Sequence, residues 1–127
     1  MPDELEMIEQ VARSKGRFAT EAYTFTVEAL NITLLKRRKR GVTGHISGQE
    51  LLAGIKQVAL DRFGYLGRTV FEAWGLRSTA NFGDIVFDLV EAGVLSKQDS
   101  DSKDDFVGGF DFVEAFERSF IASQPSK

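Results

Sequence analysis

The chain of 127 residues is 43% apolar and 28% charged, carries a formal net charge of −3 and contains no cysteine. Its length predicts one domain with a core of its own, and its 11 phenylalanines argue against disorder over most of the chain. The lack of cysteine excludes disulfide bonds, thiolate metal sites and cysteine nucleophiles, and no apolar run reaches the roughly 20 residues of a membrane span.

The first predicted element is a helix that begins at Pro2. Proline suits the first turn of a helix, because its missing N–H would have no partner there. Apolar side chains then recur at helical spacing from Leu5 to Ala12, and Gly16 is a typical helix stop. The stretch is acidic and amphipathic, which is not the pattern of a secretory signal peptide.

A second helix is predicted over residues 20–39. Apolar residues lie three and four positions apart along it, at Tyr23, Val27, Leu30 and Leu34. Residues 23–27 also alternate in polarity, so a short strand is the alternative there, but the longer stripe favours the helix. Its last turn holds five consecutive cations, which interact favourably with the helix dipole: Lys36, Arg37, Arg38, Lys39 and Arg40.

The third helix has the clearest predicted start. Ser47 and Glu50 form a capping box, in which each side chain accepts a hydrogen bond from a backbone N–H that the helix leaves unpaired. Ile46 before the cap and Leu51 after it form a hydrophobic staple, which fixes the direction of the entering chain. The preceding stretch, about 43–46, is a candidate short strand.

Residues 66–95 are predicted to form a helix-turn-helix-like segment. Its first helix, about 66–74, buries Leu66, Val70 and Trp74. Its second helix, about 80–92, is capped by Thr79 and ends before Gly93.

A β-hairpin is predicted over residues 94–110, where two apolar stretches flank a solvated acidic loop at 97–105. Asp111 and Glu114 then form a second capping box. They open a final helix that carries three apolar residues on one side, Val113, Phe116 and Phe120.

These elements predict a mainly α-helical fold with a small β-hairpin. A helix pair that lies between a short strand and a hairpin is the winged-helix arrangement, so the second half of the chain is expected to be winged-helix-like. We expect a single domain over residues 1–122 and a disordered tail over residues 123–127. A fold of this kind does not by itself specify a function.

Several segments of the chain form a recognisable set. The most specific are SGQELL at 47–52 and the pattern WGL–T–FG–IVF between Trp74 and Phe87, and Glu21-Ala22-Tyr23 accompanies them. Over roughly residues 18–116 the chain resembles a small uncharacterised bacterial family, found mainly in planctomycete and verrucomicrobial lineages. No activity, cofactor or catalytic residue is known for that family, so the resemblance implies only a bacterial, cytoplasmic protein.

The second helix of the predicted pair carries acidic charges alone. A helix that reads DNA would need Arg or Lys there, because most of the affinity for DNA comes from neutralising phosphates. Asp84 and Asp88 are four residues apart and share one face, and Glu91 follows three residues later. We interpret Asp84, Asp88 and Glu91 as an interaction surface for another protein, to which an exposed apolar or aromatic patch adds affinity.

The basic run Lys36–Arg40 is the candidate anion-binding site. Such a run suits nucleic acid or anionic lipid, whereas a solvated helix end with these charges needs no function. Five successive helical residues point in all directions around the helix, so they do not face one groove together. A nucleic-acid-associated regulator that uses this run is the alternative to a protein-binding module.

Two further candidates concern catalysis and metal binding. His45 is the only histidine, and as a general base beside Ser47 it would support a small hydrolase, which is the third hypothesis. The structural interpretation is a loop residue before a helix cap. The acidic residues Asp99, Asp101, Asp104 and Asp105 do not match an EF-hand, because Lys103 and Asp104 stand where an oxygen ligand and a glycine belong.

The leading hypothesis is a non-enzymatic module in the cytoplasm that binds another protein or a second copy of itself. It predicts no cofactor, no metal site and no association with a membrane.

Overall fold

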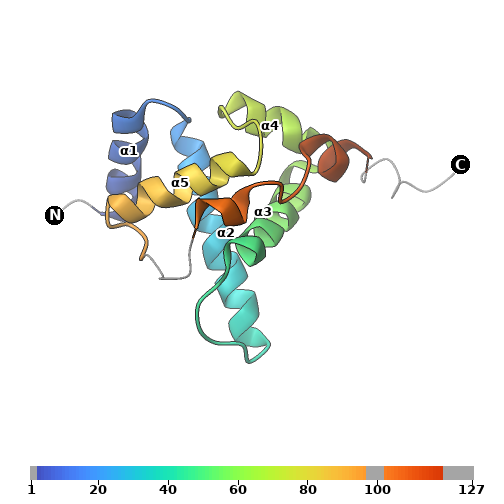
Figure 1. Cartoon of the computed structure of the whole chain (residues 1–127), viewed down its shortest axis with the longest axis horizontal. Coiled ribbons are helices and arrows are strands. Elements are labelled where there is room, and N and C mark those ends of the chain that lie inside the picture. Colours follow the sequence, from blue (N-terminus) through green and yellow to red (C-terminus); the bar gives the residue numbers. More distant parts are fainter. Residues whose placement is uncertain (1–2, 97–101, 119–127) are drawn as a thin grey trace, which may run out of the picture.

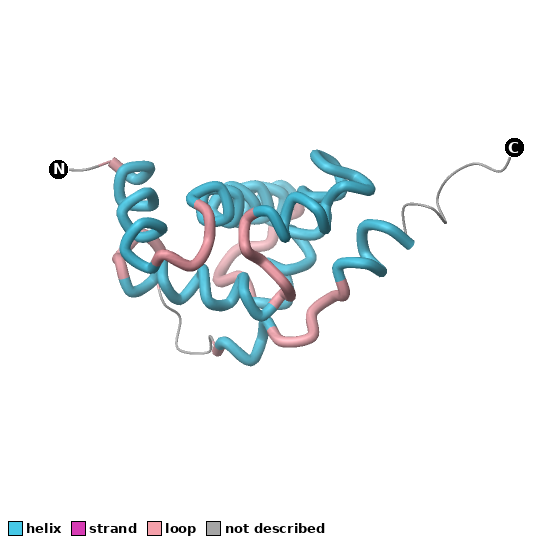
Figure 2. The backbone as a smooth tube through the Cα atoms, turned by 90° about the horizontal axis from the view of Figure 1, so that it is seen from above, coloured by secondary structure: helices cyan, strands magenta, loops and turns pink. Residues whose placement is uncertain are grey.

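The computed structural model describes residues 3–96 and 102–118, which form helices and contain no strand (Figures 1 and 2). The five α-helices are α1 (Glu4–Lys15), α2 (Thr20–Lys39), α3 (Gly48–Phe63), α4 (Gly67–Ala73) and α5 (Ala80–Glu91). Three short elements accompany them, the 3₁₀-helices η1 (Gly64–Leu66) and η2 (Lys103–Phe106) and the π-helix η3 (Val113–Arg118). The predicted mainly α-helical fold is confirmed.

Local capping signals set the ends of α1. The side chain of Asp3 accepts a hydrogen bond from the Glu6 N–H at 2.8 Å, so Asp3 is the N-cap. The predicted stop at Gly16 is confirmed. Its φ of 63° lies in the left-handed region that glycine adopts most readily, and its N–H donates to the Ala12 carbonyl. The helix begins at Glu4, because Asp3 is extended, so the predicted start at Pro2 is wrong; Pro2 itself lies outside the described residues.

The predicted bounds of α2 and the predicted start of α3 are also confirmed. α2 is helical throughout, so the alternative of a strand over 23–27 is wrong. Ser47 caps α3, because its Oγ accepts a hydrogen bond from the Glu50 N–H at 3.1 Å. Both residues of the predicted staple are buried, Ile46 and Leu51.

An aromatic cluster around Phe71 of α4 forms the centre of the core. Phe71 is fully buried, and its ring centroid lies between 5.2 and 5.7 Å from those of Phe25, Phe82, Phe112 and Phe116. The pairs meet edge to face, a geometry that adds about 0.5–1.5 kcal/mol each beyond the area they bury. Because the four rings come from α2, α5 and the C-terminal segment, Phe71 connects three parts of the fold.

The buried face of α4 differs from the predicted one, which comprised Leu66, Val70 and Trp74. Leu66 lies in η1 and is 58% exposed, whereas Phe71 and Gly67 are buried. A Cβ at Gly67 would lie 2.5 Å from the ring of Phe116, so only glycine allows the two elements to come this close. This contact turns Gly67 and Phe71, four residues apart, towards the core.

The β-hairpin predicted over residues 94–110 is wrong for the part of that segment that the structure describes, which contains no strand. Residues 103–106 form η2 instead, and Phe106 is buried. The Thr79 hydroxyl donates to the Phe106 carbonyl at 2.6 Å and accepts from the Gly109 N–H at 3.0 Å. In a hairpin, backbone groups such as this carbonyl and this N–H would bond to the neighbouring strand. Here the Thr79 side chain bonds both of them instead.

Thr79 is consequently not the side-chain cap of α5 that the sequence predicts. No described side chain caps α5, and the Asn81 Oδ1 instead accepts from the backbone N–H groups of Arg77 at 2.7 Å and Ser78 at 3.2 Å in the turn before the helix. The short strand predicted at 43–46 does not form either. Within residues 3–96 and 102–118, the helix pair α4–α5 therefore has no β wing beside it.

The C-terminal segment packs on α4. The Asp111 side chain accepts from the Glu114 N–H at 2.9 Å, which confirms half of the predicted capping box. Arg68 of α4 forms an ion pair with Glu117 of η3. Phe120 and the predicted tail at 123–127 lie outside the described residues.

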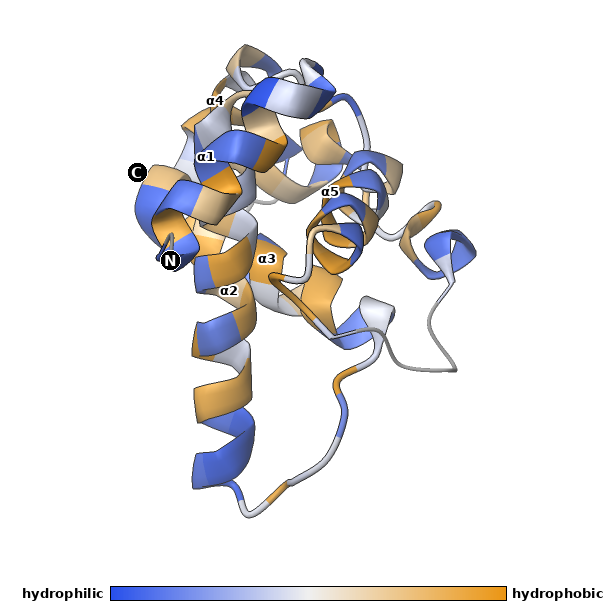
Figure 3. Ribbon diagram, turned by 90° about the vertical axis from the view of Figure 1, so that its left-hand side faces the viewer, coloured by the Kyte–Doolittle hydropathy of each residue, from blue (hydrophilic) through white to orange (hydrophobic). Residues whose placement is uncertain are grey.

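The C-terminal half of α2 projects from the other helices (Figures 1 and 3). The connection to α3 returns along it, and the hydrophilic residues gather at the tip (Figure 3). We call residues 35–47 the arm. It holds the whole basic run, Lys36–Arg40.

Candidate functional site

The acidic residues of α5, predicted as an interaction surface, are paired within the chain. Asp84 Oδ2 accepts a hydrogen bond from Arg17 Nη1 at 3.0 Å, and Asp84 Oδ1 lies 3.7 Å from Lys103 Nζ. The side chains of Asp84 and Asp88 are only 23% and 22% exposed. Little of their surface is therefore available to a partner.

Lys15 and Tyr23 engage the other acidic groups. Lys15 Nζ lies 2.8 Å from Glu91 Oε1 and 3.8 Å from Asp88 Oδ1, and the Lys15 hydrogen bond lowers the pKa of Glu91. Tyr23 donates to Asp88 Oδ2 at 2.7 Å. Burial, reinforced by this hydrogen bond, raises the pKa of Tyr23. The three carboxylates thus hold α1 and α2 against α5.

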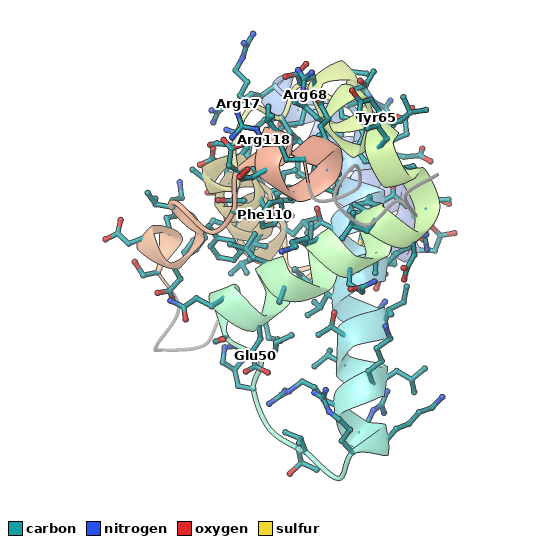
Figure 4. All side chains as sticks on the ribbon, turned by 90° about the vertical axis from the view of Figure 1, so that its right-hand side faces the viewer. Arg17, Glu50, Tyr65, Arg68, Phe110 and Arg118 are labelled. Atoms are coloured by element: carbon teal, nitrogen blue, oxygen red, sulfur yellow. The ribbon has the colours of Figure 1, made fainter. Side chains whose placement is uncertain are left out.

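The basic run is divided by the structure into one buried cation and four exposed ones. Arg37 is 6% exposed, and its Nη1 donates to the Gly44 carbonyl at 3.0 Å. Its Nε lies 3.1 Å from Glu50 Oε2 without forming a hydrogen bond, so this contact is purely electrostatic. Figure 4 shows Glu50 at the base of the arm. Arg37 therefore fastens the arm turn to α3 and is not part of an anion-binding surface.

The other four cations of the arm are exposed, and within the described ranges their side chains have no ion pair: Lys36, Arg38, Lys39 and Arg40. Residues 29–49 contain no Asp or Glu that could neutralise them. The arm therefore presents uncompensated positive charge to solvent.

An apolar pocket of about 370 Å³ lies between α2 and α5, next to the turn of the arm. One wall comes from α2 with Leu30 and Leu34, and the other comes from α5 with Val86, Phe87 and Val90. The turn at 44–48, Leu51, Phe106, Leu95 and Ser96 complete the lining. Its volume and composition are those of protein sites for small molecules or apolar side chains, which measure about 300–1,000 Å³.

The two walls follow from helical spacing. Leu30 and Leu34 are four residues apart on α2, and Val86 and Val90 are four apart on α5, so each pair forms one side of the pocket. All four side chains are only partly buried. Phe106 closes the base of the pocket and packs against Gly48 and Gly83. A Cβ at either glycine would lie within about 3 Å of Phe106, so the two glycines allow this close packing.

A second hollow of about 330 Å³ continues the pocket along the arm. It shares Leu34 and Gly44 with the first and adds Arg37, Arg38, Val42 and Thr43. Together the two hollows form a trough, which runs from the apolar face of α5 to an exposed guanidinium.

His45 and Ser47, the candidates for hydrolysis, both line the pocket. The Ser47 hydroxyl oxygen accepts the capping hydrogen bond of α3, so it already has a structural role. The hydrolase hypothesis stays a prediction. Of the EF-hand candidates, Asp99 and Asp101 lie outside the described residues, and Asp104 and Asp105 lie in η2.

No group of three side chains suited to a metal ion occurs in the described part of the chain. Of the helices in the same part, none combines the length and the apolar content that crossing a membrane requires.

Reasoning from sequence missed the pocket, because it used the α2 stripe only as evidence for a helix and did not ask where along the stripe burial ends. Tyr23 and Val27 are buried, but Leu30 and Leu34 are only partly buried. The available signal is Arg38, four residues after Leu34, since a guanidinium at the next step of an apolar stripe indicates that the stripe has left the body of the protein.

Comparisons of this chain with protein-family models, with curated proteins and with solved structures found no match. The site therefore defines the protein only as a helical protein with an apolar pocket and a basic arm.

Proposed function

We propose that this protein is a non-enzymatic binding module whose pocket accepts apolar side chains of a partner protein. The observation that carries the proposal is the pocket of about 370 Å³ between Leu30 and Leu34 of α2 and Val86 and Val90 of α5. Grooves between helices commonly bind an amphipathic helix by its apolar face. The bacterial, cytoplasmic setting that the family resemblance implies is part of the same proposal.

The proposal places the interaction surface at the pocket and not at Asp84, Asp88 and Glu91. At Asp84 and Asp88, which are 23% and 22% exposed, a partner cation would compete with Arg17, Lys15 and the Tyr23 hydroxyl, whereas the side chain of Glu91 pairs with Lys15 but is 73% exposed. The α4–α5 pair keeps its helix-turn-helix-like connection in this proposal and acts as a scaffold, because α5 supplies one wall of the pocket.

Affinity capture with matched variants tests this function. The wild-type protein, Val90→Gln and Val70→Gln are immobilised and exposed to bacterial lysate, and the retained proteins are quantified by mass spectrometry. Val90 and Val70 are both partly buried helical valines, but Val70 is not part of the pocket lining. Circular dichroism and thermal melting establish that both variants are folded.

We expect at least one protein that the wild type and Val70→Gln retain and that Val90→Gln loses. The polar amide in the pocket removes the apolar contact on which a partner side chain depends. Identical sets of retained proteins for all three baits would show that the pocket is not the binding site.

A second candidate is weak binding of nucleic acid by the arm, which the four exposed cations favour: Lys36, Arg38, Lys39 and Arg40. Four phosphate contacts predict a loss of about a hundredfold in affinity between about 50 and 200 mM salt. Fluorescence anisotropy with labelled duplex DNA and single-stranded RNA measures this loss. Binding that persists when all four are changed to Gln would exclude the arm as the contact.

A further inference from the structure

The α2 wall of the pocket changes its chemistry within one helical turn. Leu30, Leu34 and Arg38 are successive residues of one stripe, four positions apart. Leu30 and Leu34 line the pocket, and Arg38 lines the hollow that continues it. One turn advances about 5.4 Å along the axis. A ligand that lies along this wall therefore meets apolar surface first and a cation directly afterwards.

No carboxylate of the neighbouring elements compensates this cation. Arg38 is exposed and, in the part of the chain that is described, has no ion pair. Glu50, at the base of the arm, pairs with Arg37. The acidic residues of α5 pair with Lys15 of α1, with Arg17 in the turn after it, with Lys103 of η2 and with Tyr23. The trough is thus apolar at one end and electropositive at the other.

We propose that the occupant of the trough is an acidic amphipathic helix of a partner protein. The inference rests on the proposed function and adds the chemistry of the partner. Apolar side chains one turn apart on the partner fill the pocket between Leu34 and Val90, and a carboxylate one turn further lies opposite Arg38. The argument is charge complementarity, because a helix with a cation at that position would face Arg38 without any acidic residue between 29 and 49 to offset it.

A library of displayed helical peptides tests the chemistry directly. Each peptide has about 15 residues, fixed leucines at helical spacing and flanking positions that vary among Glu, Gln and Lys. The library is selected on the wild-type protein and depleted on Val90→Gln. The peptides that remain depend on the pocket, and their flanking residues report the charge that the trough prefers.

The selected peptides are then titrated against two charge reversals on the arm, Arg38→Glu and Lys36→Glu, at about 150 mM salt. The two changes alter the net charge equally, but Lys36 lies on the side of α2 that faces α3. We expect enrichment of Glu, about a tenfold loss of affinity for Arg38→Glu and less than about a threefold loss for Lys36→Glu.

Pocket-dependent peptides that are neutral or basic would overturn the proposed partner chemistry, and so would an absence of pocket-dependent peptides. Equal effects of the two charge reversals would also overturn it, because they would indicate general attraction to the arm. A dimer that Val90→Gln converts to monomers in sedimentation would identify a second copy of this chain as the occupant. If capture from lysate depends on Val90 but the peptides show no acidic preference, the proposed function stands and this inference fails.

Discussion

Replacing Thr79 by valine tests the contact that takes the place of the predicted hairpin. Thr79 is 1% exposed, and its hydroxyl bonds both the Phe106 carbonyl and the Gly109 N–H. Valine keeps the branched shape and removes both hydrogen bonds. Phe106 and Gly109 lie 27 and 30 residues after Thr79 in the sequence. The substitution therefore weakens the attachment of a distant segment and leaves the helical propensity of α5 almost unchanged.

The expected loss follows from the two groups left behind. A buried polar group without a partner costs about 1–3 kcal/mol. Phe106 is 3% exposed, so its carbonyl carries most of this cost, whereas Gly109 is exposed and its N–H can bond water. We therefore expect Thr79→Val to lower the free energy of unfolding by about 2 kcal/mol, or Tm by about 8 °C for a chain of this size.

Urea denaturation followed by circular dichroism measures the loss, with two controls. Thr79→Ser keeps the hydroxyl and should retain most of the stability, and Thr69→Val changes an exposed threonine of α4. A loss below about 0.5 kcal/mol for Thr79→Val, or equal losses for the valine and serine variants, would refute the claim that the hydroxyl holds this segment.

Three further changes are expected to alter stability, each measured by urea denaturation. Gly67→Ala should destabilise by about 1–2 kcal/mol, because the clash of its Cβ with the Phe116 ring outweighs the gain in helix propensity of about 1 kcal/mol. Ser47→Ala should cost about 1 kcal/mol through loss of the α3 cap. Tyr23→Phe should remove a pH dependence. Above the ordinary tyrosine pKa of 10.0 the unfolded chain releases a proton that folded Tyr23 retains, so wild-type stability falls as pH rises, by up to about 1.4 kcal/mol per pH unit.

The helices could be predicted because their signals are local. Gly16 at the end of α1, Ser47 at the start of α3 and Asp111 before η3 act on backbone groups within four residues. Such contacts depend only on the neighbouring sequence. The helical bounds that rest on them accordingly agree with the structure.

The wrong predictions depend on contacts between distant residues. The inward face of α4 is set by Gly67 against Phe116, and the missing hairpin is replaced by Thr79 against Phe106. An apolar stretch such as 106–110 suits a strand, yet whether it pairs with another strand or packs under a helix depends on residues that periodicity does not identify.

The candidate site shows the same division. The sequence places the charges of Asp88 and Glu91 but not their partners, since Tyr23 is 65 residues from Asp88 and Lys15 is 76 residues from Glu91. The basic run could be predicted from the sequence, but the burial of Arg37 could not. Arg37 contacts Gly44 and Glu50, and these residues come close to it only because the chain turns back after α2.

The arm itself follows from a difference in length. α2 has 20 residues and α5 has 12, which correspond to axial lengths of about 30 and 18 Å. A helix that is longer than its neighbour must extend beyond it, and leucines on its inward stripe then lack a packing partner at the point where the neighbour ends. On α2 these leucines are followed at once by cations, which favour solvent and keep the end of the helix from folding back onto the core. Apolar surface next to unpaired positive charge therefore persists in the folded chain, and a partner that covers both gains from burial and from charge together.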